Sequence, residues 1–136
     1  MPVPGSLKRR PVDEKKLAEL LQRQFEIKPL ETRAYLRLLE GHDMTLHELS
    51  RELDIPLSES QALAERLLSS GFVIRGAGSE TRLAPLHPRM TMTNIFKVYE
   101  KGVVDALRDH RATVDRVVNL LTPIFEERKI REDDTT

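Results

Sequence analysis

The stretch that decides the fold is Met44 to Pro85, MTLHELSRELDIPLSESQALAERLLSSGFVIRGAGSETRLAP. It contains two short amphipathic helix patterns, which are separated by a turn at Ile55-Pro56 and followed by Gly71 and a β-prone segment. Two tandem helices followed by a hairpin form the element order of a winged helix-turn-helix domain. The sequence therefore predicts a mainly α fold with a short β-hairpin wing.

Each of the two helix patterns begins with the sequence of a capping box. Thr45 precedes Glu48 by three residues, and Ser58 precedes Gln61 by the same interval. Such pairs satisfy backbone N–H groups that have no partner within the helix. The second helix is expected over residues 58–70, with a solvent face that holds Glu59, Ser60, Gln61 and Glu65.

The wing is expected over residues 72–85. Gly71 can take the left-handed conformation that ends the preceding helix, and residues 76–79 can turn the chain back into a second strand. Met44 is expected to add a minimal strand against the wing.

Two further helices precede this stretch and are expected to complete a three-helix core. Asp13 can cap the first, which should end near Ile27, and Pro29 suits the first turn of the second, which Gly41 ends. The winged-helix domain is therefore expected over residues 13–88. Residues 1–12 are expected to form a disordered basic arm because prolines, a glycine and a basic run dominate them.

A long apolar seam follows the wing. After an extended connector that includes Arg89, a helix is expected from about Asn94 to Thr122, with a kink or restart at Pro123. Apolar residues then recur at alternating steps of four and three, as in a coiled coil. The members of the seam are Val103, Leu107, His110, Val114, Val117, Leu121 and Ile124. The seam predicts a dimerisation helix over residues 89–129, and residues 130–136 are expected to form a disordered tail.

His110 is the polar member of the seam. One interpretation is a core polar residue that sets the register of the homodimer. The other is a pH-sensitive dimer, because charging two apposed imidazoles would disfavour association.

Composition limits the classes of protein that this chain can represent. The 136 residues allow one domain with an appendage, and the formal net charge of zero argues against indiscriminate nucleic-acid binding. No cysteine is present, and no apolar run is long enough to span a membrane. The pairs His42-Asp43 and His47-Glu48 do not have the spacing of metal ligands. A cytoplasmic protein with no catalytic activity, no metal and no cofactor is expected.

A winged helix reads DNA by placing its second helix in the major groove, with arginines and lysines on the phosphates. Residues 58–70, however, have a net charge of minus one. A protein-interaction module that does not bind DNA directly is therefore the alternative. The candidate DNA contacts are Ser58, Ser60 and Gln61 at the start of the helix, with Arg66, Arg75, Arg82, Arg89, Lys8, Arg9 and Arg10 for the backbone.

The runs LLQRQFEIKPLETRAYLRLLEG, MTLHELSRELDIPLSES and LLSSGFV, within residues 17–73, are similar to the winged-helix domain of archaeal TrmB-like transcriptional regulators. The resemblance implies a DNA-binding regulator with a long dimerising helix after the wing. Many family members continue into a C-terminal effector domain that binds sugars, and these 136 residues, which end after the seam helix, give no support for sugar sensing. The family also tends to place basic residues and an aromatic at the start of the recognition helix, where this sequence has Leu57, Glu59 and Gln61.

Overall fold

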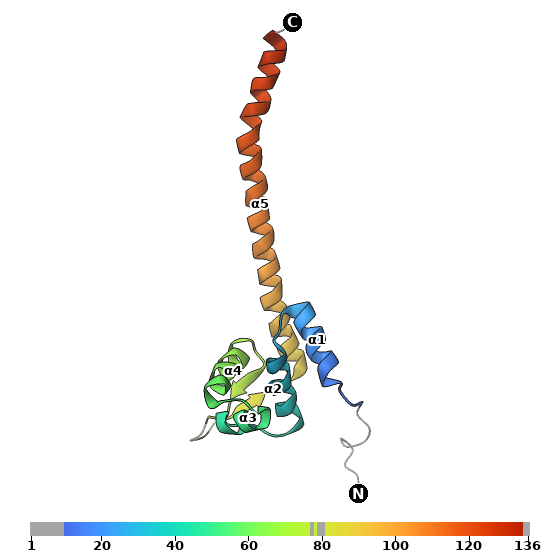
Figure 1. The fold of residues 1–136 in the computed structure, drawn as a ribbon, viewed down its shortest axis with the longest axis vertical. Helices are drawn as coiled ribbons and strands as arrows, with labels where there is room; N and C mark the ends of the chain where they lie inside the picture. The colour runs from blue at the N-terminus through green and yellow to red at the C-terminus, as the bar shows by residue number, and fades with distance from the viewer. Residues whose placement is uncertain (1–9, 77, 79–80, 135–136) are drawn as a thin grey trace. The chain divides into compact units, whose positions relative to one another are not determined.

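The computed structural model describes residues 10–76, 78 and 81–134, and the chain divides into two units, Met1–Lys97 and Val98–Thr136. Figure 1 shows the elements in chain order. Their bounds are α1 Glu14–Phe25, α2 Pro29–Glu40, α3 Leu46–Leu53, α4 Leu57–Ser69, β1 Val73–Arg75, β2 Leu83–Pro85 and α5 Pro88–Asp134. The winged helix-turn-helix fold that the sequence predicts is confirmed.

The first two helices begin and end largely as predicted. The Asp13 side chain caps α1 by accepting a hydrogen bond from the backbone N–H of Lys16. Glu26, with φ 61°, ends α1 in the left-handed conformation, slightly before the predicted end near Ile27. Pro29 opens α2 at its first position, where no backbone N–H is needed.

Of the two predicted caps, the one at Thr45 is present and the one at Ser58 is not. Thr45 caps α3 and accepts from the backbone N–H of Glu48 at 3.2 Å. The prediction for Ser58 is wrong, because α4 begins at Leu57 and Pro56 occupies its N-cap position. The Pro56 carbonyl already accepts from the N–H of Ser60, so the helix starts before Ser58 can act as its cap.

The end of α4 is fixed by backbone geometry at Gly71, as predicted. Gly71 has φ 81°, and its N–H bonds to the carbonyl of Leu68 while that of Phe72 bonds to the carbonyl of Leu67. This pair of bonds is a Schellman motif, which requires a left-handed residue after the helix. The chain then turns directly into β1.

The wing is an antiparallel hairpin with Val73 opposite Pro85 and Arg75 opposite Leu83. Met44 forms an isolated antiparallel bridge with Leu83, which confirms the predicted minimal strand. Three residues of the predicted turn, 77, 79 and 80, lie outside the described residues.

The core of the first unit lies where α2 packs against α1, α3, α4 and β2. Apolar side chains of α2, α3, α4 and the wing are almost completely buried there, because the amphipathic helices turn their apolar faces inward. The largest of these are Phe72, Leu38, Leu49, Leu63, Leu67 and Leu83. This packing determines which residues of α4 remain available at the surface.

α5 is longer than predicted at both ends. It begins at Pro88, so Arg89 is helical and not part of an extended connector, because proline suits the first position of a helix. It also continues through Pro123 without a break, where the neighbouring Thr122 hydroxyl donates to the carbonyl of Val118.

The predicted disordered tail is helical as far as it is described. Residues 130–134 belong to α5, and an ion pair between residues four positions apart, Arg128 and Glu132 at 3.0 Å, supports its last turns.

In the parts of the chain that the structure describes, no helix combines the length and apolarity needed to cross a membrane.

Candidate nucleic-acid interface

The solvent face of α4 differs from the predicted face at one residue. Ser58, Glu59, Gln61 and Glu65 are exposed as predicted, whereas Ser60 is completely buried. The Ser60 hydroxyl donates to the carbonyl of Leu46 at 2.9 Å, which joins α4 to the start of α3. Ser60 faces the core because it lies one turn before Leu63 and Ala64. The prediction that Ser60 faces solvent is therefore wrong, and its hydroxyl is not available to DNA.

Arg66, the basic residue of α4, is directed toward α2. Its Nε lies 2.8 Å from Oε1 of Glu31, whose side chain is 7% exposed. A carboxylate this deeply buried needs a charged partner, because water cannot solvate it. The Arg66 guanidinium is therefore engaged with the core, and it is less available to a phosphate than the sequence suggested.

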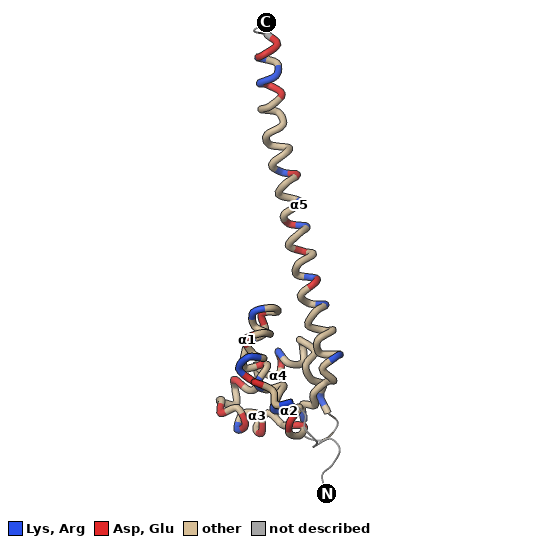
Figure 2. The backbone as a smooth tube through the Cα atoms, turned by 90° about the vertical axis from the view of Figure 1, so that its right-hand side faces the viewer, with Lys and Arg blue, Asp and Glu red and all other residues tan. Residues whose placement is uncertain are grey.

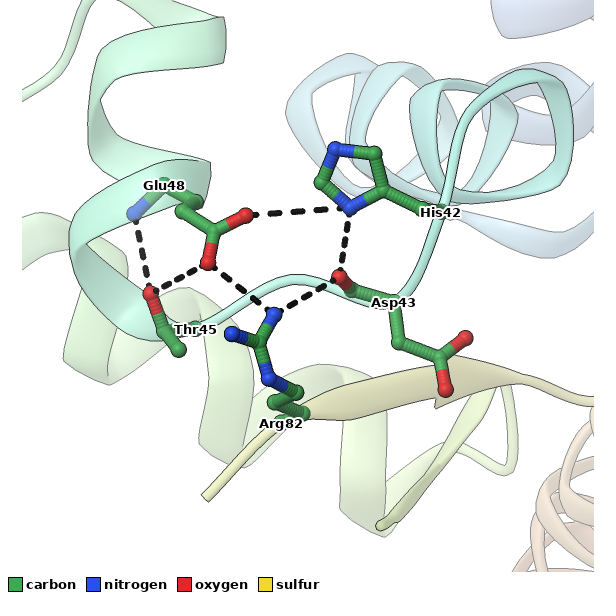
Figure 3. Close-up of polar contacts among 5 residues, drawn as sticks. All are labelled: His42, Asp43, Thr45, Glu48 and Arg82. Atoms are coloured by element: carbon green, nitrogen blue, oxygen red, sulfur yellow. Dashed lines mark hydrogen bonds and ion pairs between the residues drawn. The ribbon is translucent and has the colours of Figure 1, made fainter. Parts of the chain in front are cut away.

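Arg82, immediately before the second wing strand, is also engaged with the protein (Figure 3). Its Nη1 donates to Oε1 of Glu48 at 3.0 Å and to the carbonyl of Asp43 at 3.3 Å. The Thr45 hydroxyl donates to the same Glu48 oxygen at 3.3 Å, and His42 Nδ1 lies 3.7 Å from the other carboxylate oxygen. These contacts fasten the base of the wing to α3.

The charge of Glu48 is maintained by this cluster. Partial burial by itself would raise the pKa of the carboxyl, but the Arg82 guanidinium, the Thr45 hydroxyl and His42 outweigh it and hold the pKa below its usual value. Glu48 is therefore ionised at neutral pH and binds Arg82 as a carboxylate. Arg82 is less available to a phosphate than the sequence suggested.

Two predicted contact residues line the same groove between α4 and the wing. Gln61 comes from α4 and Arg75 from β1, and both side chains are exposed. The groove has a volume of about 390 Å³, and its other lining residues are Leu46, Ala64, Glu65, Leu68, Thr81 and Leu83. A hydrogen-bonding amide and a guanidinium thus face solvent at the junction of recognition helix and wing.

Arg89 lies in the first turn of α5, in a separate concavity. This hollow has a volume of about 740 Å³ and is lined by His87, Arg89, Met90, Thr93, Asn94 and Lys97. Arg10 is exposed, whereas Lys8 and Arg9 lie outside the described residues. The predicted basic contacts are therefore spread over several elements.

Sequence reasoning overlooked Arg51 as a possible backbone contact. It is exposed on α3, one helical turn after the exposed His47. In helix-turn-helix proteins the first helix of the motif crosses the phosphate backbone. The spacing of His47 and Arg51 on the polar face of α3 was the signal that could have identified this residue.

The described residues contain no group of three or more His, Asp or Glu side chains arranged to hold a metal ion. His42 instead faces Glu48, with its Nδ1 3.7 Å from a carboxylate oxygen (Figure 3).

In the second unit, α5 presents a broad apolar face. Along the length of this helix, basic and acidic residues alternate with uncharged stretches (Figure 2). The predicted seam residues Val103, Leu107, Val114, Val117, Leu121 and Ile124 are each between 42% and 62% exposed, and His110 is exposed among them. Val104, Val118, Leu120 and Phe125 widen this apolar face. A helix with so much exposed apolar surface has the character of an interaction element.

Residues 21–89 match the family model described as "Sugar-specific transcriptional regulator TrmB". Among curated relatives, the DNA-binding transcriptional repressor TrmBL2 of Thermococcus kodakarensis is 25% identical over 111 residues, which are 82% of this chain and 42% of the relative. A putative regulator of the same name from Pyrococcus furiosus is 24% identical over the same shares. The chain thus spans less than half the length of these curated relatives.

Solved structures agree on the fold. The structure of TrmBL2, described as an archaeal chromatin protein, matches with a TM-score of 0.70 and 23% identity over 82% of this chain and 43% of that one. A transcriptional regulator from Thermotoga maritima matches with a TM-score of 0.51 and 17% identity over 84% of this chain and 87% of the other. At this level of identity the likeness supports the winged-helix architecture.

Proposed function

This chain belongs to the TrmB family of transcriptional regulators, whose model matches half of it, and we propose that it binds double-stranded DNA as a homodimer to regulate transcription. The main support from the structure is the position of Gln61 and Arg75 on one exposed groove between α4 and the wing. The archaeal relatives, one of them described as a DNA-binding repressor, support the same function.

In this proposal α4 enters the major groove with its N-terminal half. Ser58 and Gln61 are the polar, uncharged residues exposed there, and a glutamine amide can form paired hydrogen bonds with the edge of adenine. Arg75 contacts phosphate from the wing. Arg51 from α3, Arg89 from α5 and the basic residues Lys8, Arg9 and Arg10 are further candidates for phosphate contacts, which position the protein without reading sequence.

The acidic residues of α4 make this a weakly charged recognition helix. Glu59 and Glu65 are exposed, while Arg66 is paired with Glu31. Affinity must then come from phosphate contacts outside α4. We expect each such contact to contribute about −0.9 to the slope of the logarithm of the binding constant against the logarithm of salt concentration.

The proposed dimer forms through the apolar face of α5 in the second unit. Its seven seam residues repeat at steps of four and three, the period of a left-handed coiled coil. A two-fold symmetric dimer would present two recognition helices to half-sites about 34 Å apart, or a multiple of that distance.

A protein-interaction module is the second candidate function. The exposed face of α4 combines two carboxylates with Leu57, which is 36% exposed, and lacks a free basic side chain within the described helix. Such a face suits a basic protein partner better than a polyanion. A cytoplasmic protein without catalysis or cofactor fits both functions.

The decisive experiment is binding to random and selected duplex DNA at increasing salt. We expect Arg75→Ala to weaken binding and to reduce the salt slope by about one. Arg23→Ala, which removes an exposed arginine from α1, is the matched control and should leave both unchanged. No binding by the unaltered protein at low salt would reject the DNA-binding function and favour the protein-interaction module.

A further inference from the structure

The groove between α4 and the wing contains a carboxylate as well as an amide and a guanidinium. Glu65 lines this groove together with Gln61, one turn earlier on α4, and Arg75 of β1. All three residues are exposed. The amide and the guanidinium suit a duplex, whereas a carboxylate at the same place repels its phosphates. Glu65 therefore weakens the binding of a duplex unless its oxygens meet a hydrogen-bond donor.

Glu65 lies on the solvent face of α4. Ser58, Gln61 and Glu65 are exposed and recur at steps of three and four residues, which places them along one line of the helix. Leu63 and Leu67, on the opposite side, are completely buried. Because these leucines anchor α4 in the core, the backbone of Glu65 keeps its place when a ligand covers the solvent face.

The charge of Glu65 is not used within the protein as far as the chain is described. Arg66, the next residue, has its Nε 2.8 Å from Oε1 of Glu31 on α2. Among the described residues, the Glu65 carboxylate takes part in no ion pair. Its oxygens are therefore available to a ligand that enters the groove.

The major groove of DNA offers few partners to a carboxylate. An ionised carboxylate only accepts hydrogen bonds, and the donors on base edges there are the amino groups of cytosine and adenine. Guanine and thymine present acceptors, which leave a carboxylate unpaired. Adenine pairs best with an amide such as that of Gln61, which both donates and accepts, whereas a carboxylate suits the cytosine amino group.

We propose that Glu65 is a specificity-determining residue, which selects a cytosine in each half-site and weakens binding to sequences that lack a cytosine there. The inference rests on the proposed DNA-binding function and names the base that this part of the groove reads. A charge left unpaired against a duplex disfavours the wrong sequence, so Glu65 acts mainly by rejection.

The spacing on α4 also predicts where this cytosine lies. Four residues of a helix span about 6 Å, and successive base pairs are about 3.4 Å apart along a duplex. Where α4 follows the major groove, the cytosine read by Glu65 should therefore lie about two base pairs from the adenine read by Gln61.

The test begins with selection of duplexes from a random library by the unaltered protein. We expect the selected half-site to contain this cytosine. Glu65→Gln keeps the shape of the side chain but adds an amide donor, which can pair with guanine and thymine. This variant should bind random duplex more tightly and should tolerate other bases at the cytosine position. The ratio of selected to random affinity should fall about tenfold.

The matched control is Glu59→Gln, which removes the same charge from an exposed residue of α4 outside the described lining of the groove. It should retain the preference for cytosine. Should Glu59→Gln relax that preference as much as Glu65→Gln does, the effect would be one of net charge and the inference would be overturned.

A second probe removes the donor from the DNA. N4-methylcytosine at the selected position carries a methyl group in place of the amino hydrogen that faces the major groove. The unaltered protein should lose about tenfold in affinity for this duplex. Glu65→Ala, which has no acceptor at this position, should bind the methylated and unmethylated duplexes equally. An equal loss for both proteins would overturn the inference.

Failure of this inference and failure of the proposed function give different results. Suppose that the unaltered protein binds duplex but selects no cytosine, or that Glu65→Gln changes the selected and random affinities by the same factor. Either result would reject the role of Glu65 and leave DNA binding intact. If neither the unaltered protein nor Glu65→Gln bound any duplex at low salt, both the proposed function and this inference would be rejected in favour of the protein-interaction module.

Discussion

Nε of Arg66 on α4 lies 2.8 Å from Oε1 of Glu31 on α2, and this ion pair joins the recognition helix to the core. Replacing Arg66 with alanine leaves a buried carboxylate without its partner. Because the Arg66 side chain is itself partly exposed, we expect a loss of about 1–3 kcal/mol in the free energy of unfolding, measured by denaturant titration. Arg23→Ala should change it by less than about 0.5 kcal/mol. Equal effects of the two substitutions would show that the pair does not stabilise the fold.

The sequence predicted the order of the elements because their signals are local. The cap at Thr45 depends on Glu48, three residues away, and the left-handed end of α4 depends on Gly71 alone. The apolar periodicity of α2 and α4 likewise required no knowledge of the partner helix. These features were therefore predicted close to their observed positions.

The functional roles of the arginines could not be predicted in the same way. Arg66 pairs with a residue 35 positions away, and Arg82 with one 34 positions away. Such pairings exist only after the helices and the wing have packed, so sequence alone presented both arginines as free surface charges. Both ion pairs make these two predicted contacts less available to a phosphate than the sequence alone suggested.

Ser58 and Ser60 offer a direct test of the corrected recognition surface. Ser60→Ala removes a buried hydrogen bond to the carbonyl of Leu46, so we expect a loss of about 1–2 kcal/mol in the free energy of unfolding. Ser58→Ala alters an exposed hydroxyl and should change stability by less than about 0.5 kcal/mol, while weakening DNA binding. Denaturant titration and duplex binding of both variants provide the comparison. The arrangement would be contradicted if a stably folded Ser60→Ala variant bound DNA more weakly while Ser58→Ala bound it as tightly as the unaltered protein.

The cluster around Glu48 predicts a dependence of stability on acidity. The folded-state pKa of Glu48 is lowered from its usual value of 4.5, so its contribution is present above that value and disappears as pH falls through the lower folded-state pKa. Protonation also removes the charge that holds Arg82. We expect the free energy of unfolding to decrease below about pH 4.5, and Glu48→Gln to weaken this decrease.

The control for the acid effect is Glu59→Gln, which alters an exposed carboxylate on α4. The free energy of unfolding of Glu59→Gln should decrease from neutral to acidic pH as much as that of the unaltered protein. A Glu48→Gln variant with the same pH profile as the unaltered protein would show that the wing is held without help from this carboxylate.

The exposed seam of α5 predicts how the chain associates. Leu107 and Leu121 lie two heptads apart on the same predicted face, and both are more than half exposed in the single chain. Replacing either with glutamate would place a charge in an apolar interface, which costs several kcal/mol when the charge has no partner. We therefore expect the unaltered protein to sediment as a dimer and both variants to sediment as monomers at micromolar concentration.

The control is Arg116→Glu, which changes an exposed residue outside the seam and should leave the dimer intact. A monomeric unaltered protein would remove the basis for two coupled recognition helices, whereas dimeric glutamate variants would place the interface on another part of the chain.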